Sequence, residues 1–254
     1  MKRVAIVGAA GRMGQVMAEG LSHEDGVEVR ALVDLSAPPQ SVGAVSATSL
    51  SDLDASSIDV VVDFSSPQGV VESAQWCAAN GVGLVVGATG LSDAQRERVS
   101  EAARTTRVVM AANFALGAVL AERFAVLAAP YFERVEVIEL HHDAKVDAPS
   151  GTSLATARAL GAARRAAGRA EMPEPTQRHS VAGSRGADVD GVRVHAVRLP
   201  GLVAHEEILF GSPGEGLTIR HDSYDRRSFV QGVMLALRKM GNEPGLSEGL
   251  GEFL

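Results

Sequence analysis

Apolar residues in the first half of the chain follow two alternating spacings, and this alternation restricts the fold more than any other feature. Residues 4–7 are continuously apolar, those of 13–21 recur at three and four positions, and 27–34 again has the pattern of a strand. A continuous run predicts a strand buried on both faces, whereas the wider spacing predicts an amphipathic helix. Strand and helix in strict turn predict a parallel sheet covered on both faces. Further strands and helices are expected at 58–64, 67–80, 82–86, 92–104 and 108–111.

The second half of the chain has a different pattern. It predicts a long helix, a strand and a second helix, at 116–129, 134–141 and 152–167. Three short strands separated by proline and glycine turns and one last helix follow, at 192–199, 203–210, 216–221 and 225–240. We therefore expect an α/β chain of two domains. Residues 1–114 and 229–254 form the parallel-sheet domain, and 115–228 form an α+β domain with a mixed or antiparallel sheet.

Composition excludes several classes of protein. Acidic residues outnumber basic ones by 31 to 24, and the net charge of -7 gives no electrostatic reason to bind nucleic acid. The most apolar stretch, 114–132, contains Glu122 and Arg123, so we expect a buried helix there and not a membrane span. The single cysteine, Cys77, lies in a predicted helix, and the apolar run near the N-terminus breaks after four residues, so we expect no export. We expect a buried thiol in a cytoplasmic protein.

A glycine-rich loop joins the first predicted strand to the first helix. Glycines at this spacing permit a tight turn in which backbone N–H groups approach a pyrophosphate. Asp34 ends the second strand 20 residues after Gly14, where a carboxylate accepts hydrogen bonds from the adenine ribose. Together they predict a Rossmann-like dinucleotide site, and the alternative is a tight turn with an unrelated aspartate. The residues of the loop before Gly14 are Gly8, Ala9, Ala10, Gly11, Arg12 and Met13.

Asp34 also bears on the choice of cofactor. A 2′-phosphate about 4 Å from this carboxylate would be repelled by roughly 4 kcal/mol per charge pair at an effective dielectric constant of about 20. We therefore expect NADH to be preferred over NADPH. Arg12 could reach such a phosphate from the loop, so the use of NADPH stays open.

Two further loops follow strands of the same predicted sheet. Ligands collect at the carboxyl ends of strands in open parallel sheets, so we expect both loops to contact the nicotinamide half of the cofactor. Asn113 offers an amide to the nicotinamide carboxamide. Ordinary turn chemistry is the alternative for both loops. Their residues are Gly87, Ala88 and Thr89 after the fourth strand, and Ala111, Ala112, Asn113 and Phe114 after the fifth.

The segment 139–152 carries the most chemistry in the chain. Ser150 or Thr152 can cap the helix that starts here, and Gly151 lets a carboxylate approach the first N–H groups. Lys145 supplies a charge-assisted contact or a proton. The segment therefore predicts a site for a substrate that bears carboxylates. In chain order its candidate site residues are His141, His142, Lys145, Ser150, Gly151 and Thr152.

Other interpretations of this segment stay open. His141 and His142 could bind a metal, but adjacent strand residues point to opposite faces and no further ligand spacing accompanies them, so we expect no metal. The segment could also be structural, with exposed histidines and an ordinary helix cap. Surface or packing roles are expected for the later histidines, which are His179, His195, His205 and His221.

These motifs together resemble the dihydrodipicolinate reductase family, also called 4-hydroxy-tetrahydrodipicolinate reductases. The resemblance rests on Val-Gly-x-x-Gly-Arg-Met-Gly near the N-terminus, the Gly-x-Thr-Gly loop, the Ala-Asn-Phe segment and, most specifically, Glu-Leu-His-His-x-x-Lys-Val-Asp-Ala-Pro-Ser-Gly-Thr at 139–152. Their order and spacing match over essentially the whole chain. The resemblance implies a dinucleotide-binding domain and a substrate-binding domain that also builds a homotetramer. It implies NAD(P)H-dependent reduction of a small cyclic dicarboxylate in the diaminopimelate route to lysine.

The resemblance also implies roles for single residues. It implies His141 as catalytic acid or base and Lys145 as proton donor, with substrate contacts from His142, Gly151 and Thr152. Cofactor contacts are implied at 8–13, 34, 87–89 and 111–114. Two positions depart from the family. Leu35 stands where many members have a basic residue, which weakens the expectation of NADPH use, and Ala88 stands where a hydroxyl residue is common.

Two other functions stay open on the sequence alone. One is a different nicotinamide oxidoreductase, such as an amino-acid dehydrogenase on the same scaffold. The other is a regulator that binds NADH without turnover, although the pair of His141 and Lys145 counts against it. Loss of NADH absorbance only with the dicarboxylate made from pyruvate and aspartate semialdehyde would separate the three.

Overall fold

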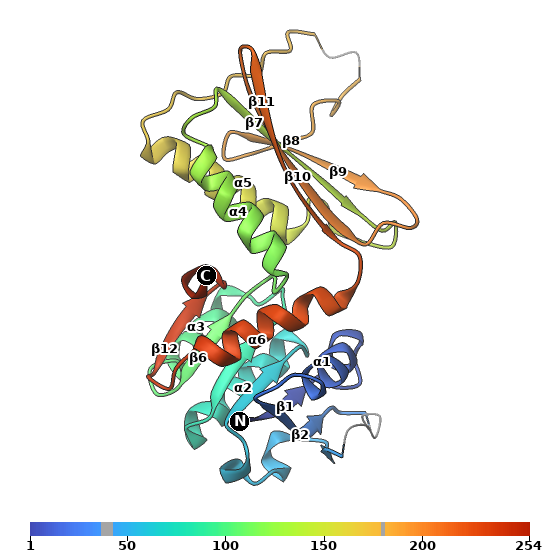
Figure 1. Ribbon diagram of the computed structural model, residues 1–254, viewed down its shortest axis with the longest axis vertical. Coiled ribbons are helices and arrows are strands. Elements are labelled where there is room, and N and C mark those ends of the chain that lie inside the picture. Colours follow the sequence, from blue (N-terminus) through green and yellow to red (C-terminus); the bar gives the residue numbers. More distant parts are fainter. Residues whose placement is uncertain (37–42, 179–180) are drawn as a thin grey trace. The chain divides into compact units, whose positions relative to one another are not determined.

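The chain divides by its internal contacts into two units (Figure 1). The computed structural model describes residues 1–36, 43–178 and 181–254. Unit 1 comprises Met1–Leu116 and Arg226–Leu254, and unit 2 comprises Gly117–Asp225. Each unit has its own sheet and its own apolar core.

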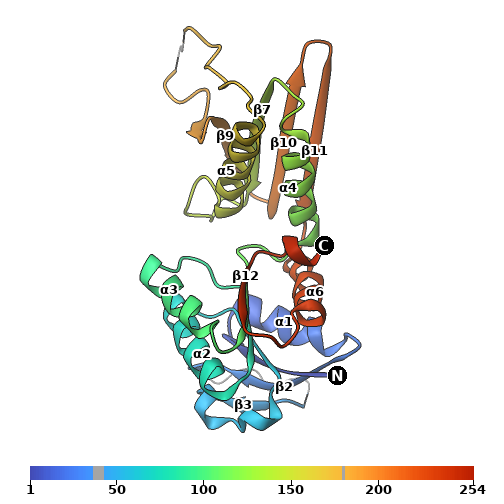
Figure 2. The same cartoon turned by 90° about the vertical axis from the view of Figure 1, so that its left-hand side faces the viewer.

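Unit 1 is a parallel sheet of seven strands in the order β12-β6-β5-β4-β1-β2-β3. Helices α2 and α3 lie on one face of this sheet, and α1 and α6 lie on the other (Figure 2). The parallel sheet predicted from the sequence is confirmed. The elements are β1 (Lys2–Val7), α1 (Arg12–Ser22), β2 (Val27–Val33), β3 (Val45–Ala47), β4 (Val60–Asp63), α2 (Pro67–Asn80), β5 (Gly83–Val86), α3 (Asp93–Ala102), β6 (Arg107–Met110), α6 (Val230–Lys239) and β12 (Gly245–Glu248).

Local sequence explains where these elements begin. Val4, Ala5 and Ile6 of β1 are fully buried, as expected of a central strand covered on both faces. Pro67 begins α2, where its missing N–H costs nothing. Ser92 and Gln95 form a reciprocal capping box at the start of α3, as their spacing predicts.

The sequence did not predict the two edge strands. β3 is Val-Ser-Ala, which is too short for its alternation to stand out, and β12 is Gly-Leu-Ser-Glu, which contains one large apolar residue. The last helix also begins later than expected, at Val230, because a short 3₁₀ helix precedes it. The 3₁₀ helices are Leu50–Asp52, Ala55–Ser57, Arg226–Phe229 and Gly251–Phe253.

Unit 2 is a mixed sheet of five strands in the order β11-β10-β7-β9-β8, with α4 and α5 packed on one face. β7 pairs with β9 in parallel, and the other pairs are antiparallel. The mixed sheet predicted from the sequence is confirmed. The elements are α4 (Leu116–Ala128), β7 (Arg134–His141), α5 (Gly151–Ala166), β8 (Ala187–Val189), β9 (Val192–Arg198), β10 (Ala204–Ser212) and β11 (Glu215–Ser223).

The helix-covered face of β7 changes character along the strand. Val135 and Val137 are buried in the apolar core of unit 2. The next two residues on the same face are Glu139 and His141, because side chains alternate along a strand. The face therefore passes from apolar to ionisable toward the end of β7 where α5 begins.

Helix α4 corrects one expectation. The stretch 114–132 was expected to be a buried helix, but only Ala121 and Ala125 of α4 are buried. Phe124 and Leu127 are 56% and 69% exposed, so the other face of α4 is apolar and uncovered. The helix carries apolar side chains on more than one of its faces, but the sheet of unit 2 covers only one of them.

The described residues include no helix that is both long and apolar enough to cross a membrane. Cys77 is a fully buried free thiol on α2, as expected. Burial raises the pKa of this thiol, so Cys77 is a packing residue rather than a nucleophile.

Candidate active site

The glycine loop of unit 1 lies at the carboxyl end of β1, which has β2 on one side and β4 on the other. Gly8 adopts a left-handed conformation with φ of 78°, and a Cβ there would come within 2.9 Å of the Phe64 backbone at the end of β4. A Cβ on Gly14 would lie 2.1 Å from the carbonyl oxygen of Gly8. Only glycine permits this approach of helix to strand.

Helix α1 starts at this loop without a side-chain cap. Its N-cap residue is Gly11, and its first turn contains no acidic residue. The positive end of the helix dipole and the first N–H groups are therefore left for an anion. The arrangement fits the pyrophosphate of a dinucleotide.

Asp34 follows β2 and holds the glycine loop in place. Its carboxylate accepts hydrogen bonds from the backbone N–H of Ala10 at 3.0 Å and of Ser36 at 3.1 Å. Each oxygen keeps a second lone pair, so the carboxylate can still accept a ribose hydroxyl. Leu35 beside it is 93% exposed.

The two other predicted loops also lie at carboxyl ends of strands in unit 1. Gly87 follows β5, and its backbone N–H donates to the carbonyl of Asp63 at 2.8 Å. Ala111 follows β6 and donates to Val86. The Phe114 side chain is fully buried against the ring of Phe64, with ring centroids 5.9 Å apart. A cofactor could therefore meet Phe114 only through its backbone.

Sequence reasoning missed Asp63, the last residue of β4. Its buried carboxyl accepts hydrogen bonds from the Ser65 hydroxyl at 2.6 Å and the Ser73 hydroxyl at 2.5 Å. Burial raises the pKa of Asp63, although the hydrogen bonds from the two serines act to lower it. This carboxyl fixes the turn after β4 against which Gly8 packs.

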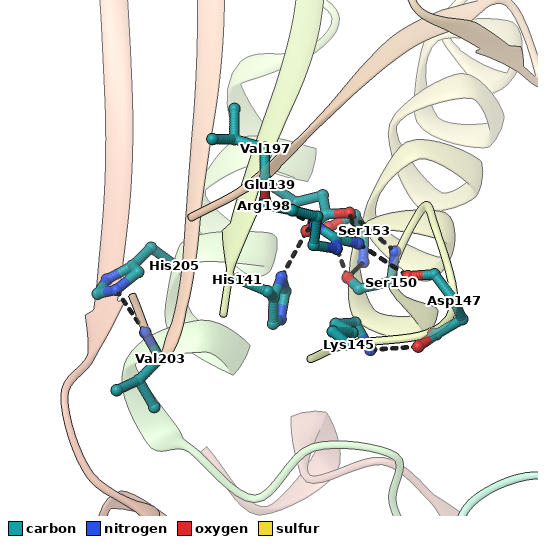
Figure 3. A network of polar contacts seen from close by, with 10 residues as sticks. All are labelled: Glu139, His141, Lys145, Asp147, Ser150, Ser153, Val197, Arg198, Val203 and His205. Atoms are coloured by element: carbon teal, nitrogen blue, oxygen red, sulfur yellow. Dashed lines mark hydrogen bonds and ion pairs between the residues drawn. The ribbon is translucent and has the colours of Figure 1, made fainter. Parts of the chain in front are cut away.

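Glu139 is the centre of the site in unit 2 (Figure 3). Its fully buried carboxylate is held by both terminal nitrogens of Arg198, at 2.7 and 2.8 Å. It also accepts the backbone N–H of Ser150 at 3.3 Å and pairs with Nδ1 of His141. Burial alone would raise the pKa of Glu139, but the hydrogen bonds and charges of Arg198 and His141 outweigh it and lower the pKa. Glu139 is therefore ionised.

The state of Glu139 determines which nitrogen of His141 carries a proton. An ionised carboxylate can only accept, so Nδ1 of His141 must be the donor. Burial lowers the pKa of His141 despite Glu139, and the positive charges of Lys145 and Arg198 act in the same direction as burial. The neutral ring therefore presents an unprotonated Nε2, which has no hydrogen-bond partner among the described residues.

Ser150 is the N-cap of α5. Its hydroxyl accepts the backbone N–H of Ser153 at 3.1 Å, and its side chain is buried. Of the two predicted caps, the structure therefore uses Ser150 and not Thr152. A Cβ on Gly151 would meet no atom within 4 Å, so open space lies before the first turn of the helix.

Lys145 lies in the loop between β7 and α5. Its ammonium group contacts the Asp147 carboxylate at 2.7 Å and lowers the pKa of that carboxyl. Asp147 is half exposed, and such a surface pair contributes at most about 1 kcal/mol. Lys145 can therefore exchange this partner for another anion. His142 is half-buried beside it, and its carbonyl accepts the Lys145 N–H.

Arg198 carried no sequence signal, although it is the cation that pairs with Glu139. It lies 59 residues after Glu139, and the two meet only because β9 pairs with β7 and brings Arg198 beside His141. The backbone of the loop between β7 and α5 depends on it too, since Arg198 donates to the carbonyl of Asp147 at 2.8 Å.

Two of the later histidines, His195 and His205, have carboxylate partners. His195 contacts Glu136 at 2.8 Å, and His205 contacts Asp222 at 2.7 Å while accepting the Val203 N–H. These contacts agree with packing roles, and His179 lies outside the described residues. Within 1–36, 43–178 and 181–254, no group of three or more His, Cys, Asp or Glu side chains could hold a metal.

Comparison with known proteins gives the family. The model of the dihydrodipicolinate reductase N-terminus matches residues 2–114, and the model of the C-terminus matches 111–254. This chain belongs to the dihydrodipicolinate reductase family. A 4-hydroxy-tetrahydrodipicolinate reductase from Beutenbergia cavernae is 48% identical over 255 residues, which are 99% of this chain and 98% of the relative.

Solved structures agree with this family. A dipicolinate-bound dihydrodipicolinate reductase from Paenisporosarcina sp. TG-14 has 38% identity, a TM-score of 0.88 and full coverage of both chains. An aspartate dehydrogenase from Thermotoga maritima, at 14% identity and a TM-score of 0.53 over 94% of this chain and 96% of that one, shares the fold alone.

Arg198→Met tests the ion pair of the site. It leaves Glu139 buried without its cation, so we expect the free energy of unfolding at pH 7 to fall by about 3 kcal/mol. The folded-state pKa of Glu139 lies below its unfolded value in the wild type, so the pair stabilises above the unfolded pKa and is lost as pH falls through the folded pKa. The difference between the two proteins should therefore shrink from pH 7 toward about pH 4.

Urea unfolding at several pH values measures this difference. Arg30→Met, which breaks the exposed pair with Glu28, is the matched control and should change stability by less than about 0.5 kcal/mol. Equal losses for Arg198→Met and the control would contradict a buried, energetically important pair.

Proposed function

We propose that this chain reduces 4-hydroxy-tetrahydrodipicolinate to tetrahydrodipicolinate, a step of the diaminopimelate route to lysine. It is an NAD(P)H-dependent oxidoreductase of the family to which its whole length belongs. The observation that carries the assignment to residues is the cluster in unit 2. There Glu139 and Arg198 hold His141 and the start of α5 together.

We assign dinucleotide binding to unit 1. The uncapped start of α1 and the close packing of Gly8 and Gly14 fit a pyrophosphate, and Asp34 fits the adenine ribose. When bound, the reduced nicotinamide supplies the hydride. The loops 87–89 and 111–114 follow β5 and β6 and hold the other half of the cofactor, with Phe114 acting through its backbone.

We assign substrate binding to unit 2. The backbone N–H groups at Gly151 and Thr152 begin α5 and bind a carboxylate, and Ser150 shapes this turn as its cap. Lys145 gives up Asp147 for a substrate carboxylate or nitrogen, and His142 lies beside it. Two fixed carboxylates would orient the ring of the substrate for hydride transfer.

Lys145 is the better candidate for the proton donor. His141 is neutral and presents an unprotonated Nε2, whereas Lys145 carries an ammonium group nearby. His141 would accept a hydrogen bond from Lys145 or from the substrate and so orient the transferred proton. The catalytic pair then comprises Lys145 as acid and His141 as the group that orients it.

NADH is the proposed preferred cofactor. The carboxylate of Asp34 repels a 2′-phosphate, and the sequence contains no lysine or arginine from 31 to 95. Arg12 is exposed in the glycine loop and is a cation that could offset this repulsion. NADPH is therefore a weaker alternative.

Assembly and location are further proposals. The exposed apolar side chains of α4, among them Phe124 and Leu127, are typical of a chain that associates, and we propose a homotetramer. The chemistry of amino-acid biosynthesis and the free thiol of Cys77 favour the cytoplasm.

His141→Gln and Lys145→Met test the catalytic assignment. Each should lower kcat at least about 100-fold, because a positioned proton-transfer group is lost. The affinity for NADH should stay within about twofold, since the dinucleotide residues lie in unit 1. Consumption of NADH with the cyclic dicarboxylate measures kcat, and binding of NADH is measured without substrate. His23→Gln, at an exposed histidine after α1, is the control, and an unchanged kcat in His141→Gln would refute the assignment.

Leu35→Arg tests the basis of cofactor preference. An exposed cation beside Asp34 should raise kcat/KM for NADPH by about tenfold, while Leu35→Gln should leave it nearly unchanged. Neither variant should alter folding, because Leu35 packs against little. A wild type that already prefers NADPH by tenfold or more would contradict the proposed role of Asp34.

A further inference from the structure

Glu206 is a second buried carboxyl in unit 2. It lies on β10 directly opposite Glu139 of β7, so both side chains point to the helix-covered face of the sheet. Only 9% of Glu206 is exposed. Its Oε1 lies 2.9 Å from the hydroxyl of Thr156 on α5, and its Oε2 is buried without a hydrogen-bond partner in the described structure.

Among the described residues, no lysine, arginine or histidine forms a hydrogen bond or ion pair with Glu206. Arg198 is committed to Glu139 through both terminal nitrogens. The partner of Glu206 on its other side is His221 of β11, and burial lowers the pKa of that histidine and favours its neutral form. From α4 the nearby titratable group is Glu122, another carboxyl whose pKa burial raises.

We propose that Glu206 is a positioning residue of the reductase site, a neutral carboxylic acid that ties the first turns of α5 to β10 and leaves Glu139 as the only buried anion beside Arg198. A carboxylate would leave a negatively charged Oε2 buried without a donor, whereas a protonated carboxyl places a neutral oxygen there. Burial raises the pKa of Glu206, the charges of Glu122 and Glu139 act in the same direction, and the hydroxyl groups of Ser153 and Thr156 on α5 only partly oppose them.

The neutral state matters for the substrate. Thr156 lies one and a half turns from the start of α5, where the proposed function, on which this inference rests, places a substrate carboxylate. Ionised Glu206 would add a second negative charge under that carboxylate. KM for the dicarboxylate should therefore rise as pH passes the pKa of Glu206, with a smaller effect on kcat.

Glu206→Gln keeps the shape and the neutral charge of the protonated side chain. It should match the wild type in kcat and KM near pH 6. Between about pH 6 and pH 10, KM of the wild type should rise about tenfold more than that of Glu206→Gln, because only the wild type gains a negative charge at this position as pH rises. Titration of the substrate and of groups common to both proteins affects both equally and cancels in this ratio. Identical pH profiles, or a loss of activity in Glu206→Gln near pH 6, would overturn the proposal.

A second measurement does not depend on activity. The infrared difference spectrum of wild type minus Glu206→Gln near neutral pH should contain the carbonyl stretch of a protonated carboxylic acid. Glu207→Gln, at the neighbouring carboxylate that pairs with Arg220 on the opposite face of β10, should show only the loss of an ionised carboxylate. Absence of the acid band for Glu206 would overturn the inference even if reduction occurs. Its presence without reduction would leave the inference on Glu206 standing and refute the proposed function.

Discussion

The ion pair of Glu139 and Arg198 is the interaction on which the site in unit 2 depends. A carboxylate without solvent exposure is tolerated only when charge and hydrogen bonds compensate for lost hydration, and here the guanidinium fork, the backbone of Ser150 and the ring of His141 do so together. Each compensating group belongs to a different part of the fold. One buried charge therefore fixes the histidine, the helix start and the end of β9 relative to one another.

The electrostatics of this cluster follow from counting charges. Burial lowers the pKa of His141 more than Glu139 raises it, and the positive charges of Lys145 and Arg198 act with burial, so the ring is neutral. Lys145 pairs with the exposed carboxylate of Asp147, and breaking this pair costs little free energy. The division between a rigid buried pair and an exchangeable surface pair suits a site that must bind and release a dianionic substrate.

The sequence predicted the parts of the structure that local pattern controls. The continuous apolar strands of unit 1, the glycine contacts of Gly8 and Gly14 and the start of α5 all arise from residues close together in the chain. Arg198 could not be found this way, because its partner lies 59 residues away and the parallel pairing of β7 with β9 leaves no periodic signature. For the same reason Glu206 looked like any strand residue until the register placed it opposite Glu139. The sequence did not reveal the exposed face of α4, because an apolar side chain gives the same pattern whether or not its own chain buries it.

The imidazole nitrogens of His141 test the central claim most directly. In ¹⁵N-labelled protein at pH 7, with the signals assigned by their loss in His141→Gln, ionised Glu139 requires a protonated Nδ1 and an unprotonated Nε2. The ring should keep that pattern until the pH falls below the usual histidine value of about 6.5. A proton on Nε2 alone, or an imidazolium that persists above that value, would contradict a neutral histidine held by the Glu139–Arg198 pair.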